Sequence, residues 1–328
     1  MTNAAEPARP EAGRSRFAAR AGWLGGALLG LILLFASALK ALDPAAFAEE
    51  IARQRVGFGL PPMAAALAAL AIEGGIGTLL IANLRRRGVM LAASALVIFF
   101  LALTGRSAWR AAHGQIDESS SCGCFGNLVD RSPNAALVQD LLMLVPTLAL
   151  AWVGRPGATA AVGIRTGAAL GVAAAIVGLA AAAPSLPLDD AATRLRPGVR
   201  LADLCAGAGA ARVCLPTVAP ALASGRHLVV LADVRDPQFA ALAGRFNRYV
   251  RGGGDPPLTV LADLEPEEQQ ALYWEVAPAF DLQATPSALL RPLYRRLPRG
   301  FLVAAGEVEE TWSGLPPEIP AAVATAPK

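Results

Sequence analysis

The chain has 328 residues, of which 54% are hydrophobic and 17% are charged, and its formal net charge is +3. Soluble domains ordinarily carry about 25% charged residues, so this deficit predicts an integral membrane protein. The small net charge, without basic runs that interleave aromatic residues, argues against nucleic-acid binding. Two histidines and four cysteines are too few for a zinc-rich protein, and no Cys-x2-Cys pair is present, so no metal site is expected.

The shortage of charge is confined to residues 22–183, whereas residues 189–320 have the composition of a globular domain. A spanning helix needs roughly 20 apolar residues. Five segments qualify, which predicts transmembrane helices at 21–42, 61–83, 89–108, 135–153 and 161–183. The last segment has the lowest hydropathy, and it carries a face of small residues suited to close packing in lipid, formed by Gly163, Gly167, Gly171 and Gly178.

Basic residues in short loops predict the orientation, because they favour the cytoplasmic side. Alternate connections are rich in arginine, namely Arg9 to Arg20, Arg85 to Arg87, and Arg155 with Arg165. We therefore expect a bacterial inner-membrane protein with a cytoplasmic N-terminus and a periplasmic or extracellular C-terminal domain. If the fifth helix did not span, that domain would be cytoplasmic. A cleaved signal peptide ending near Ala36-Ser37-Ala38 is an alternative for the first helix, and it would leave the later topology unchanged.

All four cysteines fall on the predicted outer side, where oxidising conditions favour disulfides. Cys122 and Cys124 lie before the fourth helix in the stretch Ser-Cys-Gly-Cys-Phe-Gly, which can close a very small disulfide ring. Strained or exposed disulfides are readily reduced, which makes this pair a redox candidate. A static disulfide, or two thiols that merely pack, fits the pattern equally well. Cys205 and Cys214 flank a Gly/Ala loop and are candidates for a structural disulfide, or for electron exchange with the first pair.

Two ionisable residues lie inside hydrophobic segments. Glu73 is near the middle of the second helix, and a membrane-embedded carboxylate is costly enough to be a functional candidate. Lys40 lies near the outer end of the first helix, where snorkelling to the interface would also explain it. Their different depths give no reason to expect a pair. Glu73 is instead expected to be neutral or bonded to its glycine-rich neighbours, Gly74, Gly75 and Gly77.

Ser37-Ala38-Leu39-Lys40, followed by Asp43-Pro44 and Phe47, resembles the opening of the methylamine-utilisation protein MauE family, whose relatives include DoxX-like membrane proteins. The resemblance continues through Pro61 and Glu73, ends with the Cys-Gly-Cys-Phe-Gly stretch and covers about residues 22–153. Family members often have an acidic residue before the first cysteine, where this chain has Ser121. The resemblance implies a role in disulfide formation during maturation of a quinone-cofactor amine dehydrogenase.

The region after the membrane helices alternates strand and helix patterns. Strands are predicted at 228–232, 258–261, 287–291, 301–304 and 308–312, and helices at 236–250 and 265–276. A β-α-β unit followed by a hairpin at Ala305-Gly306 resembles the thioredoxin fold. Thr285-Pro286 resembles that fold's cis-proline loop, which makes Pro286 the cis-proline candidate.

The position where thioredoxin-like enzymes carry Cys-x-x-Cys holds Asp236-Pro237-Gln238-Phe239 in this chain. A carboxylate and a phenyl ring cannot exchange thiols, so this domain is expected to bind or dock rather than to catalyse. Asp236 is expected to cap the following helix, with Pro237 in its first position.

The expected fold is a membrane α-helical bundle of five transmembrane helices followed by a C-terminal α/β thioredoxin-like domain. A cytoplasmic basic tail precedes a four-helix MauE/DoxX-like domain, a fifth helix with its connection, a linker and the extracytoplasmic domain. These parts cover residues 1–21, 22–153, 154–183, 184–200 and 201–328.

Three functions fit these residues. The leading hypothesis is a thiol–disulfide oxidoreductase in which Cys122 and Cys124 are the redox pair and Lys40 and Glu73 shape the membrane site. Its partners would be the lipid bilayer and an extracytoplasmic client, and the resemblance suggests an amine dehydrogenase subunit as that client. The second is a non-catalytic assembly factor that holds a client near the membrane. The third is a DoxX-like subunit that passes electrons to a membrane quinone, which is the one candidate cofactor.

Overall fold

The computed structural model describes residues 11–115, 132–153, 161–207 and 212–319. Cys122 and Cys124 therefore lie outside the described residues. The chain divides into a helical unit and an α/β unit, and the second unit includes the stretch Ser185–Lys328. Each unit is described by itself below.

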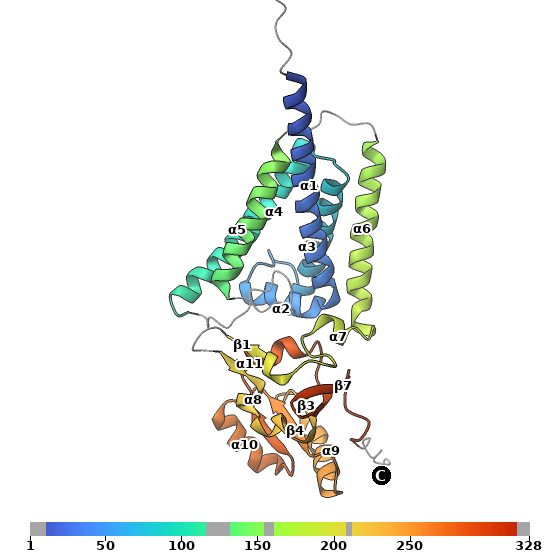
Figure 1. Ribbon diagram of the computed structural model, residues 1–328. Coiled ribbons are helices and arrows are strands. Elements are labelled where there is room, and N and C mark those ends of the chain that lie inside the picture. Colours follow the sequence, from blue (N-terminus) through green and yellow to red (C-terminus); the bar gives the residue numbers. More distant parts are fainter. Residues whose placement is uncertain (1–10, 116–131, 154–160, 208–211, 320–328) are drawn as a thin grey trace, which may run out of the picture. The chain divides into compact units, whose positions relative to one another are not determined.

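Among its described residues, the helical unit contains five helices that are long and apolar enough to cross a membrane, which confirms a multi-span membrane protein (Figure 1). These are α1 (Glu11–Leu42), α3 (Pro62–Ile81), α4 (Arg87–Ala112), α5 (Pro133–Trp152) and α6 (Val162–Ala182). An additional short helix, α2 (Pro44–Gln54), follows α1 and was not predicted from the sequence. Asp43 begins it by accepting a hydrogen bond from the Ala46 amide at 3.1 Å, and Pro44 occupies its first turn.

A close backbone contact in this unit joins α1 and α3. A methyl group added to Gly30 would lie 2.5 Å from the Gly77 carbonyl oxygen, and one added to Gly77 would lie 2.8 Å from the Gly30 oxygen. Glycine is therefore required on both sides of this contact. The small-residue face predicted on the fifth span plays no such part among the described residues, because a methyl group at any of its four glycines would meet nothing within 4 Å.

Arg85 closes the end of α5 next to this contact. Its buried guanidinium Nη1 donates to the carbonyl oxygens of Ala151 at 3.1 Å and Val153 at 3.2 Å, and Nε donates to Asn83 Oδ1 at 2.9 Å. The last carbonyls of a helix lack intrahelical partners, so a cation at this position satisfies them. One of the arginines that predicted the orientation is thus also a packing element.

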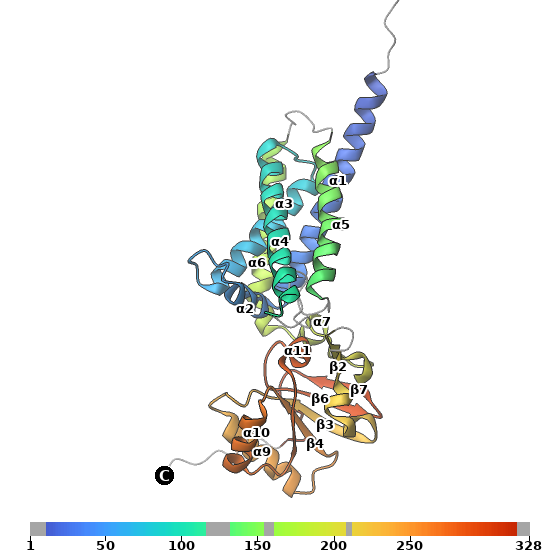
Figure 2. The ribbon, with the colours of Figure 1, turned by 90° about the vertical axis from the view of Figure 1, so that its left-hand side faces the viewer.

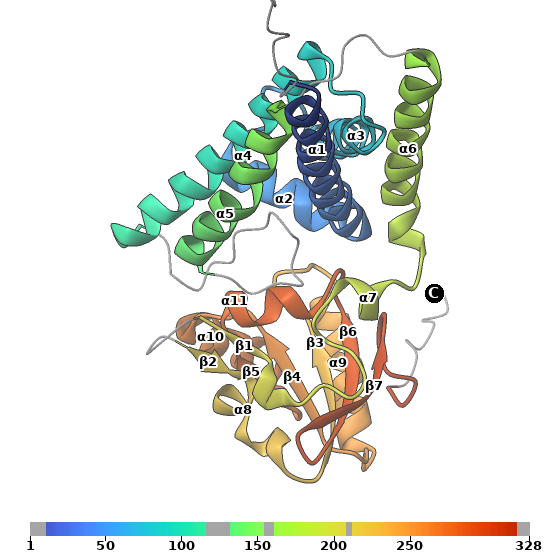
Figure 3. The ribbon, with the colours of Figure 1, turned by 45° about the horizontal axis from the view of Figure 1, so that its top comes forward.

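The α/β unit is built on a five-stranded sheet with the order β5-β4-β3-β6-β7 (Figure 3). β3, β4 and β5 are parallel, whereas β6 and β7 run antiparallel to their neighbours. The strands are β3 (Arg226–Leu231), β4 (Leu258–Ala262), β5 (Asp281–Ala284), β6 (Arg299–Ala304) and β7 (Glu307–Trp312). A membrane helical bundle followed by an α/β domain agrees with the fold class that the sequence predicts.

Each face of the sheet is covered by a different part of the chain. Alternate residues of β3, such as Leu228 and Val230, pack with the apolar side of α9 (Phe239–Arg251), and α10 (Pro266–Val276) adds partly buried side chains to this cluster (Figure 2). Val229 and Leu231 point to the opposite cluster, which takes in Leu195, Leu201 and the short helix α11 (Ser287–Leu290). Side chains of a strand alternate between faces, which explains the division.

Several local predictions in this unit hold. Ala305 and Gly306 have φ values of 48° and 79°, as expected for the two central residues of a tight hairpin turn between β6 and β7. α10 begins with Pro266 in its first turn, and Glu265 and Glu268 form a reciprocal capping box.

Other local predictions are wrong. Residues 287–290 form α11 rather than a strand, because a short apolar run does not distinguish a buried strand from a buried helix. The edge strand β5 was missed because its Asp281-Leu282-Gln283-Ala284 sequence is partly polar. The cis peptide bonds of the described residues precede Pro256 and Pro298, not Pro286.

The start of α9 also differs from the prediction. The helix begins at Phe239 with Gln238 as its N-cap residue. Asp236 lies one turn earlier, where its Oδ1 accepts the Gln238 amide at 2.8 Å, so it shapes the turn before the helix rather than capping it. Phe239 is buried in the core.

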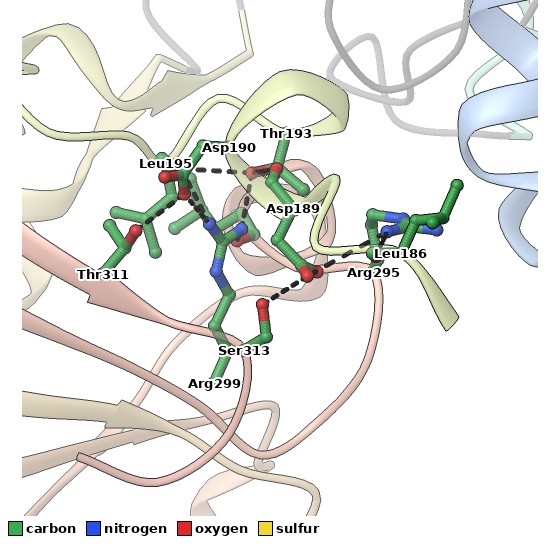
Figure 4. Close-up of polar contacts among 10 residues, drawn as sticks. Leu186, Asp189, Asp190, Thr193, Leu195, Arg295, Arg299, Thr311 and Ser313 are labelled. Carbon is green, nitrogen blue, oxygen red and sulfur yellow. Dashed lines mark hydrogen bonds and ion pairs between the residues drawn. The ribbon is translucent and has the colours of Figure 1, made fainter. Parts of the chain in front are cut away.

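The segment expected as a linker is tied to the α/β unit through Arg299 (Figure 4). This fully buried guanidinium donates to Leu293 O at 2.7 Å, Asp190 Oδ1 at 2.8 Å and Leu195 O at 2.9 Å. Asp190 belongs to α7 (Asp189–Ala192) and also accepts from Thr311 Oγ1 at 2.6 Å. Burial lowers the pKa of Arg299, while the charges of Asp189 and Asp190 oppose that shift. The α/β unit thus includes the chain from Ser185 onward.

Replacing Arg299 with methionine should therefore destabilise this unit. The change removes the hydrogen bonds to two buried carbonyl groups and the cation beside Asp190, which we expect to lower the free energy of unfolding by about 3 kcal/mol. Urea unfolding of a fragment covering residues 185–328, followed by circular dichroism, measures the effect.

Arg226→Met is the matched control, since Arg226 makes an exposed ion pair with Glu309 at 2.9 Å. Exposed pairs are worth about 0–1 kcal/mol, so this control should change little. Equal small losses for both variants would contradict the role given to Arg299.

Candidate functional site

The candidate site in the helical unit is a buried ion pair between Lys40 and Glu73. Lys40 Nζ donates to both carboxylate oxygens of Glu73, at 2.7 Å and 2.9 Å. The two side chains are only 2% and 1% exposed, so water does not screen the pair. This corrects the expectation that Glu73 would be neutral or bonded to its glycine neighbours.

The direction of helical side chains explains why residues at different depths meet. Side chains of a helix tilt toward its N-terminus. Lys40 is in the last turn of α1, so its long side chain reaches back into the bundle. α3 runs in the opposite direction, so Glu73 tilts toward the end of the bundle where α1 finishes. α1 and α3 are also close at this level, since a methyl group added to Gly74 would lie 3.7 Å from Ser37 Oγ.

Aromatic rings complete the surroundings of the ammonium group. The ring centroids of Phe47, on α2, and Phe100, on α4, lie 4.9 Å and 5.0 Å from Lys40 Nζ. Both are within the range of a cation–π interaction, which gains strength where water is excluded. Four helices thus contribute to one charged group: α1 carries it, α3 neutralises it, and α2 and α4 cover it.

A cavity of about 310 Å³ opens beside the pair. Lys40 and Glu73 both line it, and most of its remaining lining is apolar. On α3 the wall includes Ile72 and three small side chains, Ala65, Ala68 and Ala69, which leave space that larger residues would fill. Phe58, which is 84% exposed, stands at the cavity with a φ of 50°, in a region that disfavours residues other than glycine.

Asp140 on α5 is a second buried carboxylate that the sequence analysis missed. It is 4% exposed and lines a small cavity of about 20 Å³ that Lys40 and Phe100 also line. The signal that singled out Glu73, an acidic residue in an apolar helix, applies equally to Asp140. Asp140 lies inside the segment 135–153 that was predicted to span, so the same signal could have found it.

The order of segments along the chain relates this site to Cys122 and Cys124. α4 ends at Ala112, and the segment carrying these cysteines follows it in the chain. The carboxyl ends of α1 and α4 lie at the same end of the bundle, where α2 also lies (Figure 1). The pair and its cavity are therefore in the half of the bundle from which the cysteine segment leaves.

The other two cysteines are bonded to each other. Cys205 on β1 (Cys205–Ala206) and Cys214 on β2 (Val213–Cys214) face each other in an antiparallel pair and form a disulfide. Cys205 is buried at 3% exposure. Because neither Asp236 nor Phe239 is a thiol, the junction between β3 and α9 offers no dithiol site. Among the described residues, no group of three or more His, Cys, Asp or Glu side chains is arranged to hold a metal ion.

Replacing either member of the ion pair should be more damaging than replacing both. Lys40→Met or Glu73→Leu alone leaves a buried charge without its partner, which typically costs about 3–5 kcal/mol. The double variant removes both charges and should be more stable than either single variant. Thermal unfolding of the purified protein in detergent measures this coupling.

Arg53→Met is the control, because it breaks an ion pair on α2 between the exposed Arg53 and the partly buried Glu50. It should have little effect. If the double variant lost as much stability as the two single variants together, Lys40 and Glu73 would not interact.

Comparison with known proteins agrees with the resemblance noted in the sequence. The family model for methylamine utilisation protein MauE matches residues 18–153. This match takes in α1 to α5, with both members of the ion pair and both cysteines of the Cys-Gly-Cys segment, and it leaves out α6 and the α/β unit. No curated protein and no solved structure gives a match to the chain. The membrane helices up to Val153 are therefore similar to those of the MauE family. This agrees with the resemblance that the sequence analysis found over residues 22–153.

Proposed function

We propose that this protein supports thiol–disulfide redox chemistry during the maturation of an extracytoplasmic client in methylamine utilisation. The observation that carries the proposal is the division of the four cysteines. Cys205 and Cys214 are joined to each other, which leaves Cys122 and Cys124 as the thiol pair for exchange. That pair lies in the segment that matches the MauE family. Thiol exchange proceeds by attack of a thiolate on a disulfide through a mixed-disulfide intermediate.

In this proposal the α/β unit is a degenerate thioredoxin-like domain that presents the client. Two features support a docking role. Its β3–α9 junction carries Asp236 and Phe239 in place of cysteines. Its α10 helix exposes two neighbouring aromatic side chains, Tyr273 at 59% and Trp274 at 79%. Exposed aromatic residues of this size are typical anchors in protein interfaces.

The same aromatic pair favours the second candidate function, a scaffold that holds a client without chemistry. A scaffold of this kind would use Tyr273 and Trp274 but would not need Cys122 and Cys124. The two functions therefore differ in what happens when the cysteines are replaced.

Single cysteine variants should trap the client. Replacing the resolving thiol blocks the second step of exchange, so either Cys122→Ser or Cys124→Ser should accumulate a covalent complex that disappears under reductant. The double variant should trap nothing and should lose client maturation. Non-reducing gel electrophoresis of membranes, followed by mass spectrometry of the complex, identifies the partner.

The Cys205→Ser/Cys214→Ser variant is the control. It removes the disulfide of the α/β unit and should trap nothing, although the unit becomes less stable. If neither single variant traps a client and the Cys122→Ser/Cys124→Ser variant matures the client normally, the redox function is excluded and the scaffold function replaces it.

The redox proposal also requires the cysteines and the α/β unit to face an oxidising compartment. With a cytoplasmic N-terminus, five spans place the chain's end outside the cytoplasm. Alkaline phosphatase fused after Lys328 should therefore be active, and the same enzyme fused after Arg87 should be inactive. The reverse pattern would place all four cysteines on the reducing side and would contradict the proposal.

A further inference from the structure

We propose that the cavity beside Lys40 and Glu73 binds the ring of a membrane quinone, which accepts the electrons released when Cys122 and Cys124 form a disulfide. This inference rests on the proposed function for its redox step, but the binding site itself follows from the geometry of the helical unit. The site consists of one charged end, aromatic walls and a rim between α2 and α3.

The size and lining of the cavity suit a small, mostly apolar ring. Its volume of about 310 Å³ is at the lower end of the range for small-molecule sites, which is roughly 300–1,000 Å³. The rings of Phe47, Phe58, Phe99 and Phe100 line it. Phe99 is 6.2 Å from Phe58 and 6.1 Å from Phe100 between ring centroids, so the walls present aromatic faces and edges against which another ring can pack.

The charged end provides the polar contact that a quinone needs. An ammonium group has three N–H donors, and the two hydrogen bonds to Glu73 account for two of them. The third can donate to a ring carbonyl oxygen in the cavity. A cationic donor stabilises the negative charge that gathers on such an oxygen during reduction, and it does so strongly where water is excluded. Glu73, bonded to the same ammonium, is placed to accept or return a proton.

The redox step balances with a quinone as the second reactant. Two thiols that form a disulfide release two electrons and two protons, and a quinone that becomes a quinol takes up two of each. Lys40 and Glu73 lie in the half of the bundle from which the segment with Cys122 and Cys124 leaves α4. The donor thiols and the acceptor ring are therefore proposed on the same side of the membrane.

Other lipid-soluble occupants match the cavity less well. A saturated acyl chain gains nothing from a buried ion pair, and it does not require phenylalanine rings to hold it. A fatty-acid carboxylate would compete with Glu73 for Lys40 and would bring a further negative charge beside a lysine that Glu73 already neutralises. A ring with neutral carbonyl acceptors avoids this cost.

The test uses the full-length protein in lipid nanodiscs and a photoreactive ubiquinone analogue with an azide on its ring. Illumination followed by peptide mass spectrometry should place the label in α2, in the connection to α3, or in α4 near Phe100. Excess short-chain ubiquinone should abolish the labelling, and palmitate should not. Lys40→Met/Glu73→Leu should lower the apparent affinity at least tenfold.

A variant that fills the cavity and a matched control distinguish loss of quinone binding from loss of folding. Ala69→Trp places an indole in the cavity and should abolish labelling, whereas Ala149→Trp on an exposed position of α5, outside the cavity, should leave it unchanged. Labelling elsewhere, labelling that survives Ala69→Trp, or competition by palmitate would overturn the assignment of the cavity to a quinone.

The Cys122→Ser/Cys124→Ser variant distinguishes this proposal from the function on which it rests. It should bind the analogue like the unmodified protein, because the cysteines act after binding. Normal labelling together with normal client maturation in this variant would refute the thiol function and leave the quinone site standing. If the unmodified protein were not labelled, the quinone site would be refuted and the thiol function would remain standing.

Discussion

The buried pair of Lys40 and Glu73 is the interaction on which the helical unit depends. An ion inside an apolar bundle costs several kcal/mol to desolvate, and only a partner with good geometry offsets that cost. Lys40 meets this condition with two hydrogen bonds to one carboxylate and two aromatic rings. Because these groups come from four helices, the pair fixes how α1, α2, α3 and α4 meet at one end of the bundle.

Close packing elsewhere allows the pair to form. The contact between Gly30 and Gly77 brings the backbones of α1 and α3 together, and Arg85 fixes the end of α5 beside α1. The small alanines of α3 then leave a cavity at the charged end rather than a filled core. A packed bundle with an open, charged cavity is the arrangement expected of a site that binds a ligand.

The sequence was sufficient wherever one local rule decides the structure. Apolar length predicts the five spans, and a glycine between two strand patterns predicts the Ala305-Gly306 turn. It was not sufficient where two distant segments meet. The backbone depths of Lys40 and Glu73 in the membrane gave no reason to pair them. Depth ignores the direction in which helical side chains point. α2 was missed because it is a short amphipathic helix beside a strong apolar span.

In the α/β unit the wrong predictions also concern segments whose structure depends on contacts with distant parts of the chain. Residues 287–290 form a helix because the surrounding core, not their own pattern, decides between helix and strand. The expected linker from 184 to 200 looked independent because its tether, Arg299, is about a hundred residues away in the chain. Such contacts depend on the finished sheet, which brings Asp190 and Thr311 within 2.6 Å.

The redox state of Cys122 and Cys124 in native membranes tests the central claim most directly, namely that the charged cavity serves these thiols. Membranes are reduced, the reductant is removed, and a thiol-reactive mass tag counts the free cysteines over time. The account predicts rapid reoxidation of this pair in the unmodified protein and slow reoxidation in the folded Lys40→Met/Glu73→Leu variant. Reoxidation at the same rate in both would contradict it.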